Sequence, residues 1–398
     1  MEEILTKSNL LIQNQSLDFV RSLQGRIDWN DRAIGLLGAS GTGKTTLLLQ
    51  RLKQHYGLSG KAVYVSLDDI FFSENKLVHF GNWFVAQGGN VLFADEVHKY
   101  PNWAREIKNL YDTHPELRIV FTGSSITDLL QHDADLSRRA VRYELPGLSF
   151  REYLSFQKVF HQQPLALNEL LTRHAEIAVE WVSQFRPLKY FTDYLARGYY
   201  PFFAENPNTY HIRLEQVVKM IIETDLRYLE GFDPANSRKV FQLLYILATN
   251  VPFKPNVTKL SAKIGIHRNT LVSYLQHLEK ARLINTLTAT GKSISTLQKP
   301  DKIYLENTNL QFALAPTLVN RGTQRETCFM NQLIHARHRI TLPVKGDFLA
   351  DDQFTFEIGG RDKSIQQKKA ADQGFVVADD LEVGVLQKIP LWLFGFLY

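Results

Sequence analysis

The 398-residue sequence contains a single cysteine, Cys328. No disulfide can form within the chain, and this composition is typical of a protein from a reducing compartment. The longest apolar stretch, residues 389–398, has about half the length that a membrane-spanning helix needs. The first residues, MEEIL, lack the basic and apolar segments of a secretory signal. We therefore expect a cytoplasmic protein that does not insert into a membrane.

Neither sign of charge dominates the sequence. Its 46 basic and 41 acidic side chains give a net charge of +5, which permits an anionic partner without requiring one. Hydrophobic residues at 44% and charged residues at 22% are ordinary values for a globular protein. A chain of this length is expected to divide into two or three domains with large cores.

Residues 38–45, which read GASGTGKT, carry the most specific signature. They fit the pattern of a phosphate-binding loop, and they lie between an apolar run and a segment that suits a helix. The glycines allow left-handed or crowded conformations, so that successive backbone N–H groups turn towards a polyphosphate. We expect Lys44 to reach the β- and γ-phosphates of ATP and the Thr45 hydroxyl to bind Mg²⁺. The predicted nucleotide-binding residues are Gly38, Ala39, Ser40, Gly41, Thr42, Gly43, Lys44, Thr45 and Thr46.

A second apolar run, residues 90–96, ends in two carboxylates with the sequence NVLFADE. A strand here would deliver Asp95 to the edge of a sheet, where its carboxylate can hold the Mg²⁺ shell that also touches Thr45. Glu96 would then orient and polarise the attacking water. The alternative is that both carboxylates cap a following helix.

A third strand is predicted over residues 116–125, and it leads to small hydroxyl residues. The hydroxyl of Thr122, Ser124 or Ser125 would contact the γ-phosphate or the lytic water. We favour Ser124 for this sensor role, with a plain turn as the alternative.

The chain resembles a family of prokaryotic AAA-type P-loop ATPases whose C-terminal domain of unknown function looks like a restriction endonuclease fold. The resemblance rests on the phosphate loop and on the segments ADEVHKYPNW, FTGSS, RYELPGLSFREYL, PDKIYLENTNL and IPLWLFGFLY, and it covers most of the chain. In that family an arginine ahead of the LSF segment is placed to act as an arginine finger, which is often supplied by a neighbouring subunit. The match implies Arg139 for this role, and hence a homo-oligomer, although Arg138 stands where the family commonly has glycine. Solvated or salt-bridged arginines are the alternative.

Residues 258–284 predict a helix, a tight turn at Gly265 and a second helix, and residues 285–302 could supply a β-wing. This pattern resembles a winged helix-turn-helix. Between residues 254 and 302 there are nine basic and two acidic side chains, and such an excess suits contact with double-stranded DNA. A protein partner is the other candidate for such a module. The residues expected to face a partner are Arg268, Asn269, Ser273, Tyr274, Gln276 and, in the wing, Lys292.

The resemblance also implies a cluster of carboxylates in the C-terminal segment. Family members carry the acidic residues of a metal-dependent nuclease, followed by a lysine two positions after the last of them. The matching positions in this sequence are Glu326, Asp347 and Glu357. Gly359 occupies the lysine position, which implies a vestigial nuclease-like cluster in a fold retained for binding. A migrated lysine or arginine at Lys363 or Arg361 is the alternative that would preserve cleavage.

The predicted fold class is α/β, with a three-layer AAA-type P-loop core, a helical region, a winged helix and an α/β domain that resembles restriction endonucleases. The predicted function is a Mg²⁺-dependent ATP-binding and ATP-hydrolysing switch that couples its nucleotide state to DNA or to a partner. The alternatives are an ATP-gated protein-interaction module without nucleic acid and an ATP-licensed nuclease. The expected domains are 1–150 (ATPase core), 151–250 (helical lid and linker), 251–305 (winged helix) and 306–398 (C-terminal α/β domain).

Overall fold

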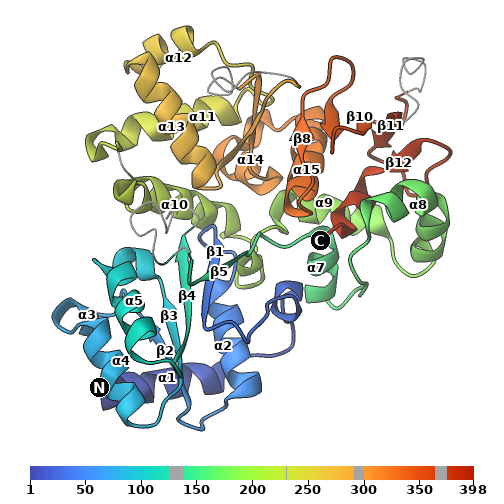
Figure 1. Ribbon diagram of the computed structural model, residues 1–398. Helices are drawn as coiled ribbons and strands as arrows, with labels where there is room; N and C mark the ends of the chain where they lie inside the picture. Colours follow the sequence, from blue (N-terminus) through green and yellow to red (C-terminus); the bar gives the residue numbers. More distant parts are fainter. Residues whose placement is uncertain (125–135, 137, 230, 291–299, 364–373) are drawn as a thin grey trace. The chain divides into compact units, whose positions relative to one another are not determined.

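A computed structural model describes the chain except for residues 125–135, 137, 230, 291–299 and 364–373. It divides into an N-terminal unit, Met1–Gly147, and a C-terminal unit, Leu148–Tyr398. Figure 1 shows the elements of both units, coloured along the sequence. The four-part division expected from the sequence is finer than this one and stays a prediction.

The N-terminal unit is built on a five-stranded parallel sheet with the strand order β2-β3-β4-β1-β5. All of these strands except β5 are largely buried, which is why they read as apolar runs in the sequence. Because the strands run in the same direction, their carboxyl ends meet at one edge of the sheet. The strands are β1 (Ala33–Gly38), β2 (Ala62–Ser66), β3 (Val91–Asp95), β4 (Arg118–Ser124) and β5 (Val141–Glu144).

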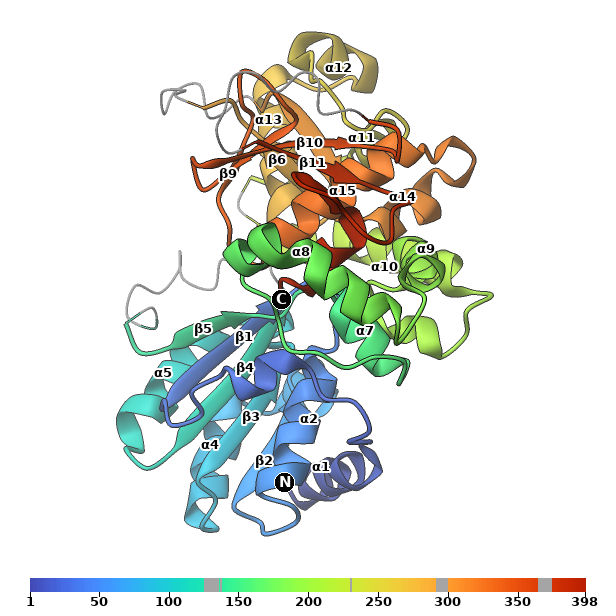
Figure 2. The same ribbon diagram turned by 90° about the vertical axis from the view of Figure 1, so that its right-hand side faces the viewer.

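Helices cover both faces of this sheet (Figures 1 and 2). One face packs on α2 (Lys44–His55), which contributes Leu47, Leu48 and Leu52 to the core. The other face packs on α4 (Leu77–Ala86) and α5 (Trp103–Thr113). This arrangement confirms the expected three-layer P-loop α/β fold.

The N-terminal helix α1 (Glu2–Asn14) packs against the edge strand β2. The buried Ser8 hydroxyl accepts a hydrogen bond of 3.0 Å from the backbone N–H of Tyr64. The outer side of an edge strand has backbone groups without a neighbouring strand to bond, and the Ser8 hydroxyl provides an acceptor for one of them. The contact also fixes the strand position from which the Tyr64 side chain projects.

The C-terminal unit combines helices with a second, mixed sheet of strand order β12-β11-β10-β9-β8. Strands β10, β11 and β12 pair in parallel, whereas β8, β9 and β10 pair antiparallel. The strands of this sheet are β8 (Ile340–Thr341), β9 (Phe348–Ala350), β10 (Phe354–Gly359), β11 (Gly374–Ala378) and β12 (Lys388–Pro390). A separate antiparallel pair is formed by β6 (Ile284–Leu287) and β7 (Lys302–Leu305). The helices are α7 (Phe150–Phe156), α8 (Leu167–Val182), α9 (Pro187–Arg197), α10 (Tyr210–Glu223), α11 (Ser237–Ala248), α12 (Val257–Ile264), α13 (Arg268–Lys280), α14 (Thr308–Leu314) and α15 (Arg321–His335).

The last residues of the chain close the C-terminal unit. The segment Leu391–Phe396 is a buried 3₁₀ helix, and Phe396 packs edge-on against Phe150 of α7. The terminal Tyr398 is buried, and its backbone oxygen accepts hydrogen bonds from the Ser149 hydroxyl at 2.8 Å and from Arg151 Nε at 2.9 Å. The two ends of this unit are therefore held together by polar as well as aromatic contacts.

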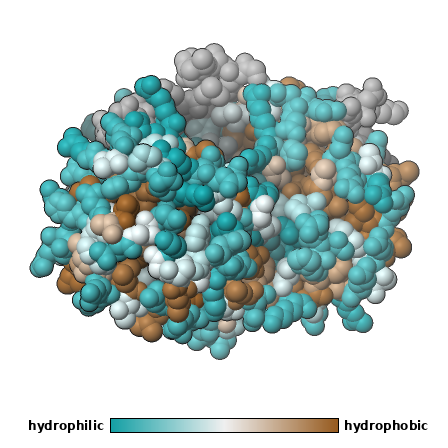
Figure 3. Space-filling view, turned by 60° about the horizontal axis from the view of Figure 1, so that its bottom comes forward, coloured by the Kyte–Doolittle hydropathy of each residue, from teal (hydrophilic) through white to brown (hydrophobic). Residues whose placement is uncertain are grey.

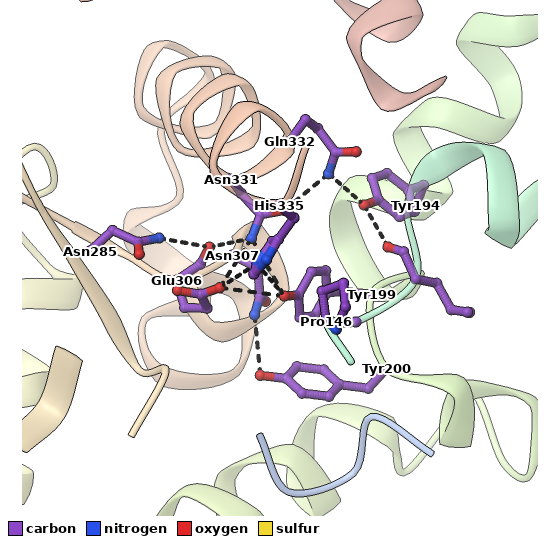
Figure 4. Close-up of polar contacts among 12 residues, drawn as sticks. Pro146, Tyr194, Tyr199, Tyr200, Asn285, Glu306, Asn307, Asn331, Gln332 and His335 are labelled. Atoms are coloured by element: carbon purple, nitrogen blue, oxygen red, sulfur yellow. Dashed lines mark hydrogen bonds and ion pairs between the residues drawn. The ribbon is translucent and has the colours of Figure 1, made fainter. Parts of the chain in front are cut away.

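A buried polar network lies between α9, α14 and α15 (Figure 4). Glu306, which is 1% exposed, contacts His335 Nε2 through Oε1 at 2.7 Å. The Tyr199 hydroxyl lies 3.1 Å from the same His335 nitrogen. Burial and the nearby Glu306 carboxylate raise the pKa of Tyr199 well above its ordinary value, so its hydroxyl stays protonated. Asn331 Nδ2 donates to the Glu306 backbone oxygen at 2.8 Å, which ties α15 to the end of β7.

One face of the molecule is drawn in Figure 3, coloured by hydropathy. On the face drawn in Figure 3, hydrophobic residues form small separate patches among hydrophilic ones. Within the described part of the chain, every helix is too short or too polar to cross a lipid bilayer.

Replacing Glu306 with alanine tests the energetic weight of the buried network. We expect the free energy of unfolding to fall by about 3 kcal/mol, because His335 and Tyr199 then stay buried without the carboxylate that they contact. Urea denaturation of the full chain measures this change. The matched control is Glu169→Ala, which removes an exposed pair with Arg173 on α8 and should cost less than about 1 kcal/mol. Equal losses in the two variants would contradict the account.

Candidate functional site

The loop between β1 and α2 is folded tightly around its own lysine. Gly41 and Gly43 have positive φ values of 83° and 94°, which side chains with a Cβ rarely adopt. Lys44 Nζ donates to the backbone oxygens of Gly38 at 2.9 Å and Ala39 at 3.1 Å. The loop therefore forms a closed turn at the N-terminus of α2, where backbone N–H groups and the helix dipole favour an anion.

Asp95, at the end of β3, accepts hydrogen bonds on both carboxylate oxygens. Its Oδ2 accepts from the Thr45 hydroxyl at 2.6 Å and from the Tyr64 hydroxyl at 2.8 Å. Its Oδ1 accepts from the Thr122 hydroxyl and, at 3.1 Å, from the backbone N–H of Glu96. The structure thus brings together Thr45, in the first turn of α2, and Asp95, at the end of β3, the two residues that the sequence analysis expected to share a Mg²⁺ ion.

Tyr64 is a donor that the sequence analysis missed. Burial, together with the Asp95 carboxylate, raises the pKa of Tyr64 far above its ordinary value, so the hydroxyl remains protonated and donates. The residue sits on β2 in register with Phe93 of β3, and this adjacency follows from the strand order. A tyrosine within an apolar run gives no such signal before the neighbouring strand is known.

The oxygens of Thr45 and Asp95 fit a magnesium ion. Hydroxyl and carboxylate oxygens are hard ligands, and Mg²⁺ is commonly held by one or two protein groups together with water and substrate phosphates. Within the described residues, no group of three or more histidine, cysteine, aspartate or glutamate side chains could hold a metal by itself. A site that shares its metal with a phosphate ligand needs no such group.

Glu96 occupies a left-handed backbone position, with φ of 54°, directly before the short 3₁₀ helix Val97–Lys99. Its N–H also donates to Thr122 Oγ1 at 3.0 Å. Its carboxylate lies 3.0 Å from Lys99 Nζ and 3.6 Å from His98 Nε2.

Lys99 bridges two carboxylates, because its Nζ also lies 3.1 Å from Asp68. Burial is the largest single influence and lowers the pKa of Lys99, but the carboxylates of Glu96 and Asp68 outweigh it and raise that pKa overall. The ammonium group therefore stays charged and orients the Glu96 carboxylate.

Ser124 and Thr122 lie on the same side of β4, since alternate residues of a strand project in the same direction. The Ser124 N–H donates to His98 Nδ1 at 3.3 Å, whereas the Thr122 hydroxyl reaches Asp95. Ser125 lies outside the described residues. The sensor role of Ser124 stays a prediction, and of the hydroxyl residues on β4 it is Thr122 that contacts the Asp95 carboxylate.

Arg139 pairs with Asp112 at the end of α5. Its Nε lies 3.0 Å from Asp112 Oδ1 and its Nη2 lies 3.2 Å from Oδ2. This is the salt-bridged arrangement considered as an alternative to an arginine finger, and the finger stays a prediction.

Helices α12 and α13 flank a turn in which Gly265 has a positive φ of 70°. Arg268 and Asn269 are exposed in the first turn of α13. The expectation that Tyr274 is exposed was wrong: it is 1% exposed and its ring packs 5.6 Å from that of Phe232. Tyr274 follows Leu271 by three positions, so it belongs to the buried stripe of the helix. Lys292 lies outside the described residues.

The three carboxylates of the expected nuclease-like cluster are each near a lysine. Glu326 accepts from the Tyr304 hydroxyl at 2.7 Å and lies 3.7 Å from Lys302 Nζ. Lys363 Nζ lies 3.1 Å from Glu357 and 3.8 Å from Asp347.

Gly359 provides the room for the Lys363 contacts. A Cβ at position 359 would lie 2.2 Å from Lys363 Cδ, so a side chain there would displace the lysine. Of the two residues considered for a migrated cation, the structure places Lys363 beside these carboxylates. The assignment of the cluster as vestigial stays a prediction.

Comparisons with known proteins give matches to two family models. Residues 30–154 match an AAA domain, and residues 188–319 match a domain of unknown function (DUF8612). Most of the N-terminal unit thus resembles an AAA domain, and the unit has a P-loop α/β fold. The restriction-endonuclease-like fold expected for residues 306–398 stays a prediction.

The chain is also similar over nearly its whole length to a protein of Methanocaldococcus jannaschii, "uncharacterized protein MJ1637". The two are 28% identical over 437 aligned positions, which cover 99% of this chain and 91% of that protein.

Solved structures show weaker likeness. AMPPCP-bound DnaA from Aquifex aeolicus is 16% identical with a TM-score of 0.27, over 70% of this chain and 86% of that one. The S. cerevisiae Hsp104-ADP complex is 17% identical with a TM-score of 0.27, over 71% of this chain and 39% of that one. Scores this low carry no argument about function, and the likeness to an AAA domain rests on the family match.

Replacing Tyr64 with phenylalanine tests how Asp95 is held. The variant loses one hydroxyl donor while keeping the ring, and we expect Mg²⁺-dependent nucleotide binding to weaken about tenfold, as when a metal ligand loses its supporting hydrogen bond. A Mg²⁺ titration of the binding of a fluorescent ATP analogue measures this. The control is Tyr143→Phe on the edge strand β5, which removes a hydroxyl that accepts a hydrogen bond of 3.0 Å from the Asp28 N–H. An equal effect in both variants, or none in either, would contradict the role of Tyr64.

Proposed function

We propose that the N-terminal unit binds ATP with Mg²⁺ and hydrolyses it, and that the chain acts as a nucleotide-dependent switch. The observation that carries this proposal is the 2.6 Å hydrogen bond from the Thr45 hydroxyl to Asp95, formed at the mouth of a glycine-rich loop. The match of residues 30–154 to an AAA domain supports it.

Different residues would bind the phosphates and the metal ion. The backbone N–H groups of residues 38–46 and the N-terminus of α2 bind the phosphates, and Lys44 neutralises part of their charge. Thr45 and Asp95 would hold Mg²⁺, which when bound offsets charge on the phosphate oxygens. Tyr64 and Thr122 keep the Asp95 carboxylate in place.

Glu96 accepts a proton from the attacking water. The Lys99 ammonium, 3.0 Å from the Glu96 carboxylate, limits the orientations of that carboxylate. The bond that forms joins the water oxygen to the γ-phosphorus, and the bond that breaks releases ADP.

Two substitutions separate binding from hydrolysis. We expect Lys44→Ala to abolish ATP binding, because the loop loses the cation it is folded around. Glu96→Gln should retain binding but lower kcat at least about a hundredfold, since an amide cannot accept the proton. Calorimetric titration and phosphate-release assays measure the two effects. Hydrolysis at the wild-type rate by both variants would contradict the proposal.

The helix-turn-helix segment of the C-terminal unit supports a second proposal, that the switch acts on double-stranded DNA. The exposed Arg268 and Asn269 begin α13, the position from which a second helix contacts bases in a major groove. The lysine-rich composition of residues 254–302 supplies charge for phosphates.

Salt dependence tests the DNA proposal. We expect binding to a mixed-sequence duplex that weakens steeply with salt, and Arg268→Ala should weaken it about tenfold or more. Fluorescence anisotropy measures the affinity. The matched control is Arg173→Ala, which removes an arginine paired with glutamates on α8 and should have no effect. Failure of the wild-type chain to bind DNA at low salt would favour a protein-interaction module gated by ATP.

The Arg139 finger would require a homo-oligomer. Arg139 would exchange its contact with Asp112 for the γ-phosphate bound by a neighbouring subunit. Its charge would then stabilise the transition state of hydrolysis in that subunit.

A further inference from the structure

Arg21 is a buried arginine that links the phosphate-binding loop to the end of the N-terminal unit. It is 6% exposed, and its Nη1 donates to the backbone oxygen of Thr42 in the loop at 2.8 Å. Its Nη2 donates to the backbone oxygens of Pro146 at 2.8 Å and Gly147 at 3.0 Å. These are the last two residues of the N-terminal unit. The planar, forked guanidinium donates to the loop and to residues 146–147 from separate nitrogens, whereas a lysine has a single nitrogen.

The same two segments also touch directly. The N–H of Leu145 donates to the backbone oxygen of Leu37 at 2.7 Å. A Cβ at Gly38 would lie 2.4 Å from the Leu145 oxygen, so the start of the loop packs against this segment with no space for a side chain. Residues 145–147 are therefore in contact with the loop at its beginning and, through Arg21, at Thr42.

The next residue, Leu148, is anchored in the C-terminal unit. Its N–H donates to the Tyr199 backbone oxygen at 2.7 Å, and its own oxygen accepts from the Tyr194 hydroxyl at 2.8 Å. Burial raises the pKa of Tyr194 well above its ordinary value, so the hydroxyl keeps its proton for this bond. Gln332 Nε2 in turn donates to the Tyr194 oxygen at 3.0 Å, which joins Leu148 to the buried polar network (Figure 4).

Adjacent residues are thus fixed to different units. Gly147 is held by Arg21, and Leu148 is held by Tyr194 and Tyr199. A single planar peptide joins them, with about 3.8 Å between their Cα atoms. Only rotations about the single bonds on either side of this peptide separate the two anchored residues, so a displacement of Gly147 acts directly on the backbone of Leu148.

We infer that Arg21 is the positioning residue through which nucleotide in the loop is sensed by the C-terminal unit. The inference rests on the proposed function. Phosphates that draw the loop N–H groups inward shift the carbonyl of Thr42, and Arg21 transfers this shift to Gly147. The bonds of Leu148 to Tyr194 and Tyr199 then change, and with them the buried network that contains Glu306 and His335.

Hydrogen exchange on the full chain tests this inference. We expect a saturating non-hydrolysable ATP analogue with Mg²⁺ to change the exchange rate of amides in residues 148–156 by about fivefold or more, the lower end of typical coupling between sites. Arg21→Lys keeps a positive charge but cannot span the three carbonyls, and it should lose this response. The matched control is Arg32→Lys, because Arg32 also donates to two backbone oxygens of the N-terminal unit, those of Tyr111 and His114, away from the loop. Its response should remain.

Tyr194→Phe provides a second test that leaves the N-terminal unit intact. It removes the donor to the Leu148 oxygen, so nucleotide binding should be unchanged while the exchange response falls. Binding of the analogue is measured in the same samples, which separates the inference from the proposed function. Absent binding by the wild-type chain would overturn both. Binding without a response in residues 148–156, or a full response in Arg21→Lys, would overturn the inference alone.

Discussion

The hydrogen bond between Thr45 and Asp95 is the contact on which the N-terminal unit depends. It joins the first turn of α2 to the carboxyl end of β3 across the edge of the sheet. Asp95 is 1% exposed, and a carboxylate so buried requires donors on both oxygens. Thr45, Tyr64, Thr122 and the Glu96 N–H supply them, so the same contacts that permit its burial also hold Thr45 and Asp95, the residues of the proposed Mg²⁺ site.

The parts of this site that follow one another in the chain could be predicted from the sequence. The spacing of residues 38–45 is recognisable because the glycines adopt backbone conformations or close contacts that other residues cannot. Asp95 ends an apolar run, and the end of such a run in a parallel sheet lies at the edge where the loop also lies. Tyr64, Lys99 and Arg21 could not be predicted, because their roles depend on which strand lies beside which and on where the chain leaves the sheet. Tyr274 was misassigned because a tyrosine suits both a buried helix face and an exposed one, while its spacing of three residues from Leu271 and its packing on Phe232 put it on the buried face.

The C-terminal unit is organised by polar groups in its interior as much as by its apolar core. Glu306 and His335 lie between helices that are far apart in the sequence, and Asn331 and Gln332 extend their contacts along α15. Such a network has few alternative arrangements, since each buried group needs its partner. It is therefore suited to respond as a whole when one of its members, such as Tyr194, is displaced. In the coupling that we infer, Arg21 and the peptide between Gly147 and Leu148 link the phosphate-binding loop to that member.

The measurement that tests the central claim most directly is the release of phosphate from ATP by the full chain, with Mg²⁺ and with Mg²⁺ removed by a chelator. The account predicts steady release with Mg²⁺ and none without it, because it assigns to Thr45 and Asp95 the role of holding the ion beside the phosphates. A folded protein that neither binds ATP nor releases phosphate in the presence of Mg²⁺ would contradict it.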